Sequence, residues 1–255
     1  MPLELVTVPC LSDNYAYLLH DAQSGATAVV DVPEAAPIRA ALAERGWRLS
    51  DIWITHHHDD HIQGIPDLRA TTGARVIGAA ADAHRLPPLD LALPPEASFA
   101  FAQSQVTTFP VPGHTLGHIA YHLPDDRLAF TGDSLMSAGC GRLFEGTPAQ
   151  MWASLSRLAK LPPDTLICSG HEYTASNLRF ALTLEPANPA LILRNDRVIV
   201  ARGEGRPTLP VPLSLELETN PFLRAHLPEL KAAIGQPDAS DLAAFTDIRA
   251  RKDRF

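Results

Sequence analysis

Cysteine is scarce in this sequence, and the three cysteines lie far apart. Cys10, Cys140 and Cys168 are too few and too scattered to form a disulfide framework. This scarcity favours a reducing compartment, and we expect a cytoplasmic protein. The N-terminus also lacks the charged and apolar regions of a secretory signal peptide. Each thiol is expected to be a small buried apolar group and not a nucleophile.

Long hydrophobic runs and an excess of positive charge are also lacking. No apolar stretch approaches the roughly 20 residues needed to span a bilayer, so no membrane association is expected. The formal net charge of -8 argues against nucleic acid or an anionic membrane as the main partner. No glycine-rich flavin or dinucleotide motif is present. An anionic small substrate would therefore need a local basic patch.

Strand and helix signals alternate through the first two-thirds of the chain. Runs of β-branched, aromatic or apolar residues predict strands at 3–8, 15–20, 27–32, 52–55, 74–78, 105–111, 118–123, 128–131 and 165–169. Apolar periodicity predicts helices at 38–45, 60–68 and 148–161. Thr147 and Pro148 form a start signal for the last of these helices. The proline- and leucine-rich stretch 86–95 is expected to be a loop.

The pattern changes after about His171. Helices are predicted at 175–184, 190–201 and 242–255, with a Gly- and Pro-rich loop at 203–212. The sequence thus predicts an α/β domain over 1–172 and a small helical domain over 173–255. The length of 255 residues fits one large domain with a small appendage. We expect a monomer.

The most informative segment of the chain is Thr-His-His-His-Asp-Asp-His at 55–61. Read as His-x-His-x-Asp-His, it places four potential metal ligands within six residues: His56, His58, Asp60 and His61. Imidazole and carboxylate groups suit zinc, iron and manganese. Because one metal takes few ligands from so short a run without strain, the cluster indicates two metals side by side. The motif follows a predicted strand, so it is expected on a loop at a strand end.

Three later segments repeat this arrangement of a strand followed by a turn that presents a ligand, and in each of them the ligand follows a glycine. They are Pro112-Gly113-His114, Gly132-Asp133 and Gly170-His171. Strand ends that meet at one sheet edge would supply seven ligands, namely His56, His58, Asp60, His61, His114, Asp133 and His171. Seven ligands match two metals that share one carboxylate and a water. Asp133 is the natural bridge because a carboxylate has two oxygens.

Two neighbouring histidines call for a different interpretation. His57 alternates with the ligands, so its side chain is expected to point away from the metals. His118 is either a hydrogen-bonding or packing partner of a ligand or a buried strand histidine.

These residues resemble the metallo-β-lactamase superfamily, whose fold is an αββα sandwich with a two-metal site at one edge. The chain is more closely similar to the type II glyoxalases (hydroxyacylglutathione hydrolases). The segments that carry this resemblance are 55–61, 112–115, 132–133, 139–142, 144–146, 170–174, 220–224 and 249–253. It implies an α/β sandwich domain with a dinuclear metal site, followed by a small helical domain that binds glutathione.

The resemblance also implies a role for each site residue. The first metal would be held by His56, His58 and His114, and the second by Asp60, His61 and His171, with Asp133 bridging. The positions that contact glutathione in the family are occupied by Arg142, Phe144, Tyr173, Arg249 and Lys252. The family often has tyrosine at position 144, and Phe144 keeps the ring but loses the hydroxyl. From the sequence alone, the terminal basic cluster would instead be a solvated helix end that complements the helix dipole.

The implied activity is hydrolysis of S-(2-hydroxyacyl)glutathione, typically S-D-lactoylglutathione, to glutathione and D-lactate. This is the second step of methylglyoxal detoxification. The expected nucleophile is a metal-bridged hydroxide, which Asp60 and Asp133 would hold and orient. Zinc is the first expectation for the two divalent ions, and iron or manganese also suits these ligands.

Several alternatives stay open at this point. The first is an iron oxygenase of the glutathione persulfide dioxygenase type, although such enzymes lack a long helical C-terminal domain. The others are a lactamase, lactonase or nuclease of the same superfamily, and a metal-binding or electron-transfer module without catalytic activity.

Overall fold

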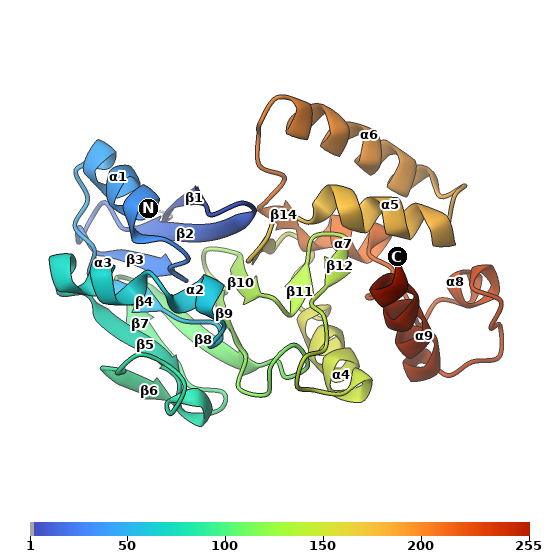
Figure 1. Ribbon diagram of the computed structural model, residues 1–255, viewed down its shortest axis with the longest axis horizontal. Coiled ribbons are helices and arrows are strands. Elements are labelled where there is room, and N and C mark those ends of the chain that lie inside the picture. Colours follow the sequence, from blue (N-terminus) through green and yellow to red (C-terminus); the bar gives the residue numbers. More distant parts are fainter. Residues whose placement is uncertain (1–2) are drawn as a thin grey trace. The chain divides into compact units, whose positions relative to one another are not determined.

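The chain forms two compact units in a computed structural model that describes residues 3–255 (Figure 1). Unit 1 extends to Pro110 and also includes Gly117–Gly132. Unit 2 consists of Val111–Leu116 and Asp133–Phe255. The boundary between 172 and 173, inferred from the sequence pattern, stays a prediction.

The first sheet of unit 1 has six strands whose spatial order follows their order in the chain. They are β1 (Glu4–Cys10), β2 (Asn14–His20), β3 (Thr27–Val30), β4 (Asp51–Trp53), β5 (Arg75–Ala79) and β6 (Leu91–Leu93). The first three strands pair in antiparallel fashion, and β3 to β6 run parallel. Parallel neighbours need long crossover connections. Helices supply two of them: α1 (Ala35–Arg45) between β3 and β4, and α2 (Asp59–Ile62) with α3 (Ile65–Thr72) between β4 and β5.

The core of unit 1 has an aliphatic side and an aromatic side. On the aliphatic side, Ile38 of α1 and Ile65 of α3 belong to one buried cluster with Ile52 of β4. Trp53, the next residue of β4, points to the opposite face because side chains alternate along a strand. Its ring lies 5.4 Å from that of Tyr121. The first sheet is therefore covered by helices on one face and by aromatic packing on the other.

The aromatic side is formed by a second, antiparallel set of strands in unit 1. These are β7 (Ser98–Phe101), β8 (Ser104–Pro110), β9 (Ile119–Leu123) and β10 (Leu128–Gly132). Tyr17 of β2 and Phe130 of β10 have ring centroids 5.6 Å apart, so the two sheets pack face to face.

Unit 2 is mainly helical. Its helices are α4 (Pro148–Leu158), α5 (Thr174–Leu184), α6 (Pro189–Gly203), α7 (Leu213–Thr219), α8 (Pro228–Ala233) and α9 (Asp241–Arg254). Its strands are β11 (Leu135–Met136), β12 (Gly139–Cys140), β13 (Leu166–Ser169) and β14 (Val211–Pro212). Thr147 is the N-cap of α4 and Pro148 its first residue, as predicted, and Thr147 also forms a capping box with Gln150. Figure 1 shows α5 and α6 side by side, and both contribute to one buried cluster.

Some sequence expectations were wrong in detail. The helix predicted at 60–68 is split into α2 and α3 at Gly64. The reason is a close backbone contact: Gly64 N–H donates to the Val32 carbonyl, and a Cβ at Gly64 would lie 2.8 Å from Val32 Cγ1. The predicted loops 86–95 and 203–212 contain the short strands β6 and β14. Within residues 3–255, no helix has the length and apolar character to cross a bilayer.

Candidate metal centre

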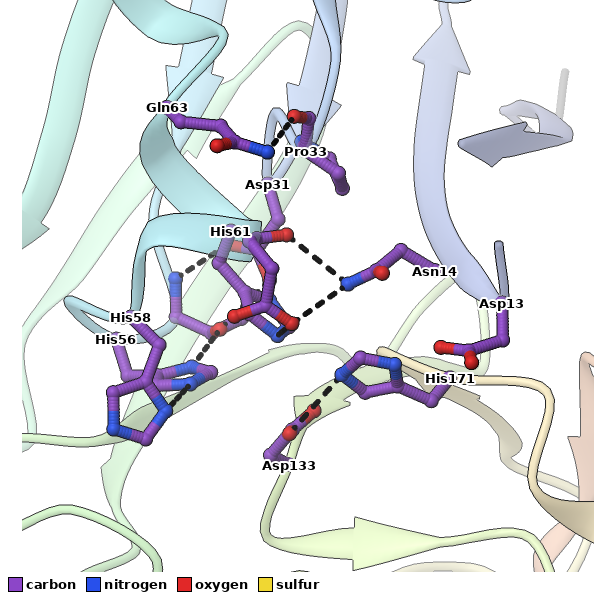
Figure 2. Close-up of polar contacts among 12 residues, drawn as sticks. Asp13, Asn14, Asp31, Pro33, His56, His58, His61, Gln63, Asp133 and His171 are labelled. Carbon is purple, nitrogen blue, oxygen red and sulfur yellow. Dashed lines mark hydrogen bonds and ion pairs between the residues drawn. The ribbon is translucent and has the colours of Figure 1, made fainter. Parts of the chain in front are cut away.

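Unit 1 brings four of the predicted ligands together. His56 and His58 lie on the turn after β4, and Asp60 and His61 are in α2. His56 Nε2 is 3.1 Å from His58 Nδ1 (Figure 2), and His61 Nε2 is 3.8 Å from Asp60 Oδ2. The ligand atoms of His56 and His61 lie within 4.8 Å of each other. The short motif thus places four donor groups around one small volume.

Asp31 fixes the orientation of His61. Its Oδ2 accepts hydrogen bonds from His61 Nδ1 at 2.8 Å and from the Thr55 hydroxyl at 2.7 Å, while Oδ1 accepts from Thr55 N–H at 2.8 Å. Asp31 is buried and has a φ of +58°. Such a φ is uncommon for a residue other than glycine and persists where the surroundings hold it. The hydrogen bond from Nδ1 leaves His61 Nε2 as the nitrogen available to a metal.

The same carboxylate acts on His56 through Thr55. The Thr55 hydroxyl donates its hydrogen to Asp31, so its oxygen accepts from His56 Nδ1, which lies 3.0 Å away. His56 therefore also presents Nε2. Asp31 was not among the ligands or site residues predicted from the sequence, although it follows strand β3 in the way that Asp133 follows β10.

Asn14 is a second residue that the sequence analysis missed. Its Nδ2 donates to Asp60 Oδ2 at 3.0 Å and to the Asp60 carbonyl at 3.1 Å. Asn14 is buried at the start of β2. Two bonds from one amide hold the Asp60 side chain relative to its own backbone. No sequence signal points to this role, because Asp13-Asn14 has the composition of a turn.

His57 and His118 have distinct surroundings. His57 Nδ1 is 3.2 Å from Asp82 Oδ2, and its Nε2 is 3.2 Å from Arg85. The expectation that His57 does not join the ligands agrees with these partners. His118 is buried, and its ring stacks on that of His56 at 4.7 Å. This contact favours the interpretation of His118 as a packing partner of a metal ligand.

Unit 2 brings together the other three predicted ligands. Asp133 Oδ2 is 3.5 Å from His114 Nε2 and 3.3 Å from His171 Nε2. Figure 2 shows the second of these contacts. His114 Nδ1 donates to the Arg142 carbonyl at 2.7 Å, so His114 presents Nε2. One carboxylate thus faces two imidazoles, which is the arrangement expected of a bridging ligand.

The donor set in each unit fits divalent metal ions. It consists of imidazole nitrogens and carboxylate oxygens, and three imidazoles donate Nδ1–H to an oxygen acceptor. The cysteines play no part in it. Burial raises the pKa of the Cys10 thiol to about 12, and also raises the pKa of Cys140 and of Cys168. These thiols stay neutral and unreactive at physiological pH, as the sequence predicted.

A basic group in unit 2 contains three of the predicted glutathione contacts: Arg142, Arg249 and Lys252. Burial and the charges of Arg249, Arg179 and Arg142 lower the Lys252 pKa to about 8, whereas Asp253 raises it. The Asp253 Oδ1 atom is 2.8 Å from Arg249 and 3.8 Å from Arg142. Positive charge is therefore concentrated locally in a chain whose formal net charge is -8.

Arg249 does not match the alternative of a solvated helix end. Its side chain is only 7% exposed, it donates to the Cys140 carbonyl at 3.0 Å, and it lies over the Phe222 ring. That interpretation of the terminal basic cluster is wrong for this residue. A role in glutathione binding stays a prediction, because Arg249 also holds the backbone at Cys140.

Two aromatic residues adjoin predicted ligands in unit 2. The Tyr173 ring stacks on His171 with centroids 4.7 Å apart, and the Phe144 ring lies 5.3 Å from His114. Tyr173 is 38% exposed and Phe144 is 62% exposed. Both rings can therefore meet a substrate while they contact a ligand.

Comparison with known proteins identifies the family. The model of the metallo-beta-lactamase superfamily matches residues 13–171, and that of the hydroxyacylglutathione hydrolase C-terminus matches 172–255. A protein of Fuscovulum blasticum named hydroxyacylglutathione hydrolase is 66% identical over 255 residues, which is 100% of both chains. The chain belongs to the hydroxyacylglutathione hydrolase family.

Solved structures share the fold of this chain. The BLEG-1 B3 metallo-beta-lactamase aligns with a TM-score of 0.67 at 20% identity, over 86% of this chain and 99% of that one. TTHA1623 in a di-iron-bound form aligns with a TM-score of 0.59 at 25% identity, over 88% of this chain and 100% of that one. The predicted α/β metallo-β-lactamase fold with a helical C-terminal part is confirmed for this hydroxyacylglutathione hydrolase family member.

Proposed function

We propose that this chain hydrolyses S-(2-hydroxyacyl)glutathione, with S-D-lactoylglutathione as the typical substrate, to glutathione and D-lactate. In a cell this would be the second step of methylglyoxal detoxification. The observation that carries the proposal is the 66% identity over the whole chain to a protein named hydroxyacylglutathione hydrolase. No finding favours the persulfide dioxygenase alternative over it.

The proposed site holds two divalent metal ions. One would be bound by His56, His58 and His114, the other by Asp60, His61 and His171, with Asp133 shared. When bound, the ions lower the pKa of a water from roughly 15.7 toward neutrality and polarise the thioester carbonyl. Zinc is the first choice, and the di-iron form of TTHA1623 supports iron as a second.

The chain's own residues would position the reactants. Asn14 holds Asp60 through two hydrogen bonds, so that this carboxylate can orient the attacking oxygen. The leaving thiolate has a parent pKa of roughly 8.5, so it departs without a strong general acid. Mutual orientation of nucleophile and carbonyl is then the main task of the protein.

Recognition of glutathione is assigned to unit 2. The carboxylates of glutathione match the positive charge of Arg142, Arg249 and Lys252. Tyr173 and Phe144 would line the approach to the thioester, and Phe144 would lack the hydrogen bond that tyrosine gives in the family. This recognition belongs to a helical domain over 173–255, which follows a catalytic domain over 1–172. We further propose a cytoplasmic monomer whose partner is this small molecule.

The deciding experiment measures S-D-lactoylglutathione hydrolysis and metal content on the same purified sample. We expect rapid hydrolysis with close to two metals per chain. Asp60→Asn should abolish most of the activity, whereas Asp59→Asn should retain it, because Asp59 is an exposed neighbour outside the ligand set. A fully metallated sample that does not hydrolyse the thioester, but consumes oxygen with glutathione persulfide, would establish the dioxygenase instead.

A further inference from the structure

The segment between Asp133 and Arg142 connects a predicted metal ligand with a predicted glutathione contact. Its conformation depends on contacts with other segments of unit 2. Asp133 contacts two imidazoles, and the Arg142 carbonyl accepts the hydrogen bond that orients His114. Between them, β11 and β12 form a hairpin with only two residues in each strand. Isolated two-stranded hairpins are marginal even when they are longer. This hairpin therefore depends on contacts made by other parts of unit 2.

Helices of unit 2 supply those contacts to each residue from Met136 to Cys140, which form the hairpin tip. Side chains of α5, α6, α7 with its C-cap, and α9 all take part. The bonds run from Asn220 to the carbonyls of Met136 and Gly139, from Asn177 to the Ser137 carbonyl, from Arg194 to the Ser137 hydroxyl, from Ala138 N–H to Glu216, and from Arg249 to the Cys140 carbonyl. We call these five side chains the hairpin clamp.

Glu216 is the centre of the clamp. It is fully buried, and its Oε2 accepts from Ala138 N–H at 2.8 Å and from Asn220 at 2.9 Å. Its Oε1 pairs with Arg194, which is also buried. A buried carboxylate is tolerated where such partners satisfy both oxygens. Ala138, which donates to it, has a φ of +55°, a conformation that persists where the surroundings hold it.

The base of the hairpin connects the hairpin tip to the predicted ligands. Gly141 N–H donates to the Ser134 carbonyl at 3.1 Å, one residue from both Asp133 and Arg142. Gly141 also lies so close that a Cβ there would be 1.9 Å from the Asp133 carbonyl oxygen and 3.0 Å from His114 Nδ1. A shift of the hairpin tip would therefore displace the Asp133 carboxylate and the carbonyl that orients His114.

We propose that the helical segment positions the metal ligands Asp133 and His114 through the hairpin clamp, with Glu216 and Asn220 as positioning residues. The helices would then have a second role besides binding glutathione. The part of this inference that concerns metal rests on the proposed function, because Asp133 and His114 are ligands only in that proposal.

The first test is independent of metal and of activity. Hydrogen–deuterium exchange of the metal-free protein should be faster across 134–142 in Glu216→Gln and in Asn220→Ala than in wild type. Glu218→Gln is the matched control, because Glu218 is exposed on the same helix. Unchanged exchange at 134–142 in both clamp variants would overturn the inference, whatever the protein catalyses.

The second test measures the release of zinc into a chromogenic chelator from the zinc-loaded, folded proteins. We expect zinc release to be about tenfold faster from Glu216→Gln and Asn220→Ala than from wild type. This is the lower end of the roughly 10- to 100-fold loss of metal affinity that follows when a group supporting a metal ligand is removed. Leu230→Ala, which removes a buried side chain of α8 outside the clamp, controls for lost stability and should release zinc at the wild-type rate.

The outcomes separate this inference from the proposed function. If the clamp variants only melt earlier and keep the wild-type release rate, the helices merely stabilise the chain and the inference fails. If Glu216→Gln does not fold, Asn220→Ala decides the result. If wild type binds zinc but does not hydrolyse the thioester, the proposed function fails while the release rates still decide the role of the clamp.

Discussion

At the scale of single residues, one buried carboxylate controls two predicted ligands. Asp31 accepts from His61 directly and from His56 through the Thr55 hydroxyl. A carboxylate behind a metal-binding imidazole fixes its tautomer and raises its basicity. The positive φ of Asp31 suits such a position, because aspartate and asparagine tolerate this conformation better than most residues. Asp31 therefore orients two predicted metal ligands from a backbone conformation that few residues adopt.

We predict that Asp31→Asn weakens metal binding by about 10- to 100-fold. Asparagine keeps the size and tolerates the positive φ, but its amide nitrogen cannot accept from His61 or Thr55. Metal content after dialysis against graded chelator measures the effect, with Asp59→Asn as the control. Equal metal retention in the two variants would remove Asp31 from the metal centre.

A second residue-scale prediction concerns Lys252 and pH. Burial and neighbouring arginines lower its pKa to about 8. A lysine is cationic below its pKa, so this positive charge is present at pH 7 and disappears as the pH rises through about 8. We expect KM for the anionic thioester to rise between pH 7 and pH 9, while kcat changes little from this cause.

Lys252→Met should raise KM at pH 7 by roughly 10-fold, the value of one hydrogen bond to a charged group. It should also flatten the rise of KM with pH. Lys160→Met, at an exposed position after α4, should leave the pH profile of KM as in wild type. A profile that keeps its shape in Lys252→Met would show that another group titrates.

At the scale of secondary-structure elements, α9 combines packing with charge. Its buried Phe245 contacts the ring of Trp152 on α4 at 5.5 Å and that of Phe222 at 5.9 Å. Arg249 and Lys252 follow one and two turns later on the same helix. The placement of both cations therefore depends on an apolar contact made at the start of α9.

We predict that Phe245→Ala lowers the free energy of unfolding by about 3–5 kcal/mol, the usual loss for a buried phenylalanine. KM should rise as well, because α9 would no longer hold Lys252 in one position. Urea denaturation and steady-state kinetics measure the two effects. Leu242→Ala, on the same helix but 38% exposed, should change both quantities much less.

At the scale of the whole molecule, the predicted ligands come from segments far apart in the chain, from His56 to His171. Any metal that binds them binds the folded chain more tightly than the unfolded one. Metal binding and folding are therefore linked. The chain has a formal net charge of -8, yet the surroundings of Lys252 are locally basic.

We predict that removal of metal by a strong chelator abolishes thioester hydrolysis and lowers Tm by about 10 °C. Saturation at 1,000 times Kd is worth about 4 kcal/mol, and each kcal/mol shifts Tm by about 2–4 °C in a chain of this size. Calorimetry before and after chelation measures the shift, and added zinc should restore both values. A chelated protein with unchanged Tm and activity would contradict the metal-dependent mechanism.

The ligand types, their spacing and the family could be read from the sequence because they are local or carried by whole motifs. His-x-His-x-Asp-His predicts a metal site wherever it follows a strand, and the strand–helix alternation predicted most of the elements. The split of the helix at Gly64 could not be read, because it follows from a contact with Val32, which lies 32 residues earlier in the chain.

The sequence alone specifies the chemistry, namely imidazoles, carboxylates, a basic C-terminal helix and neutral thiols. Only the tertiary structure revealed which groups hold that chemistry in place. Asp31, Asn14 and the clamp residue Glu216 belong to no motif, and each acts on a partner that is 24 to 78 residues away. Hydrogen bonds between such distant residues form where the folded backbone brings donor and acceptor together, so spacing along the chain does not reveal them.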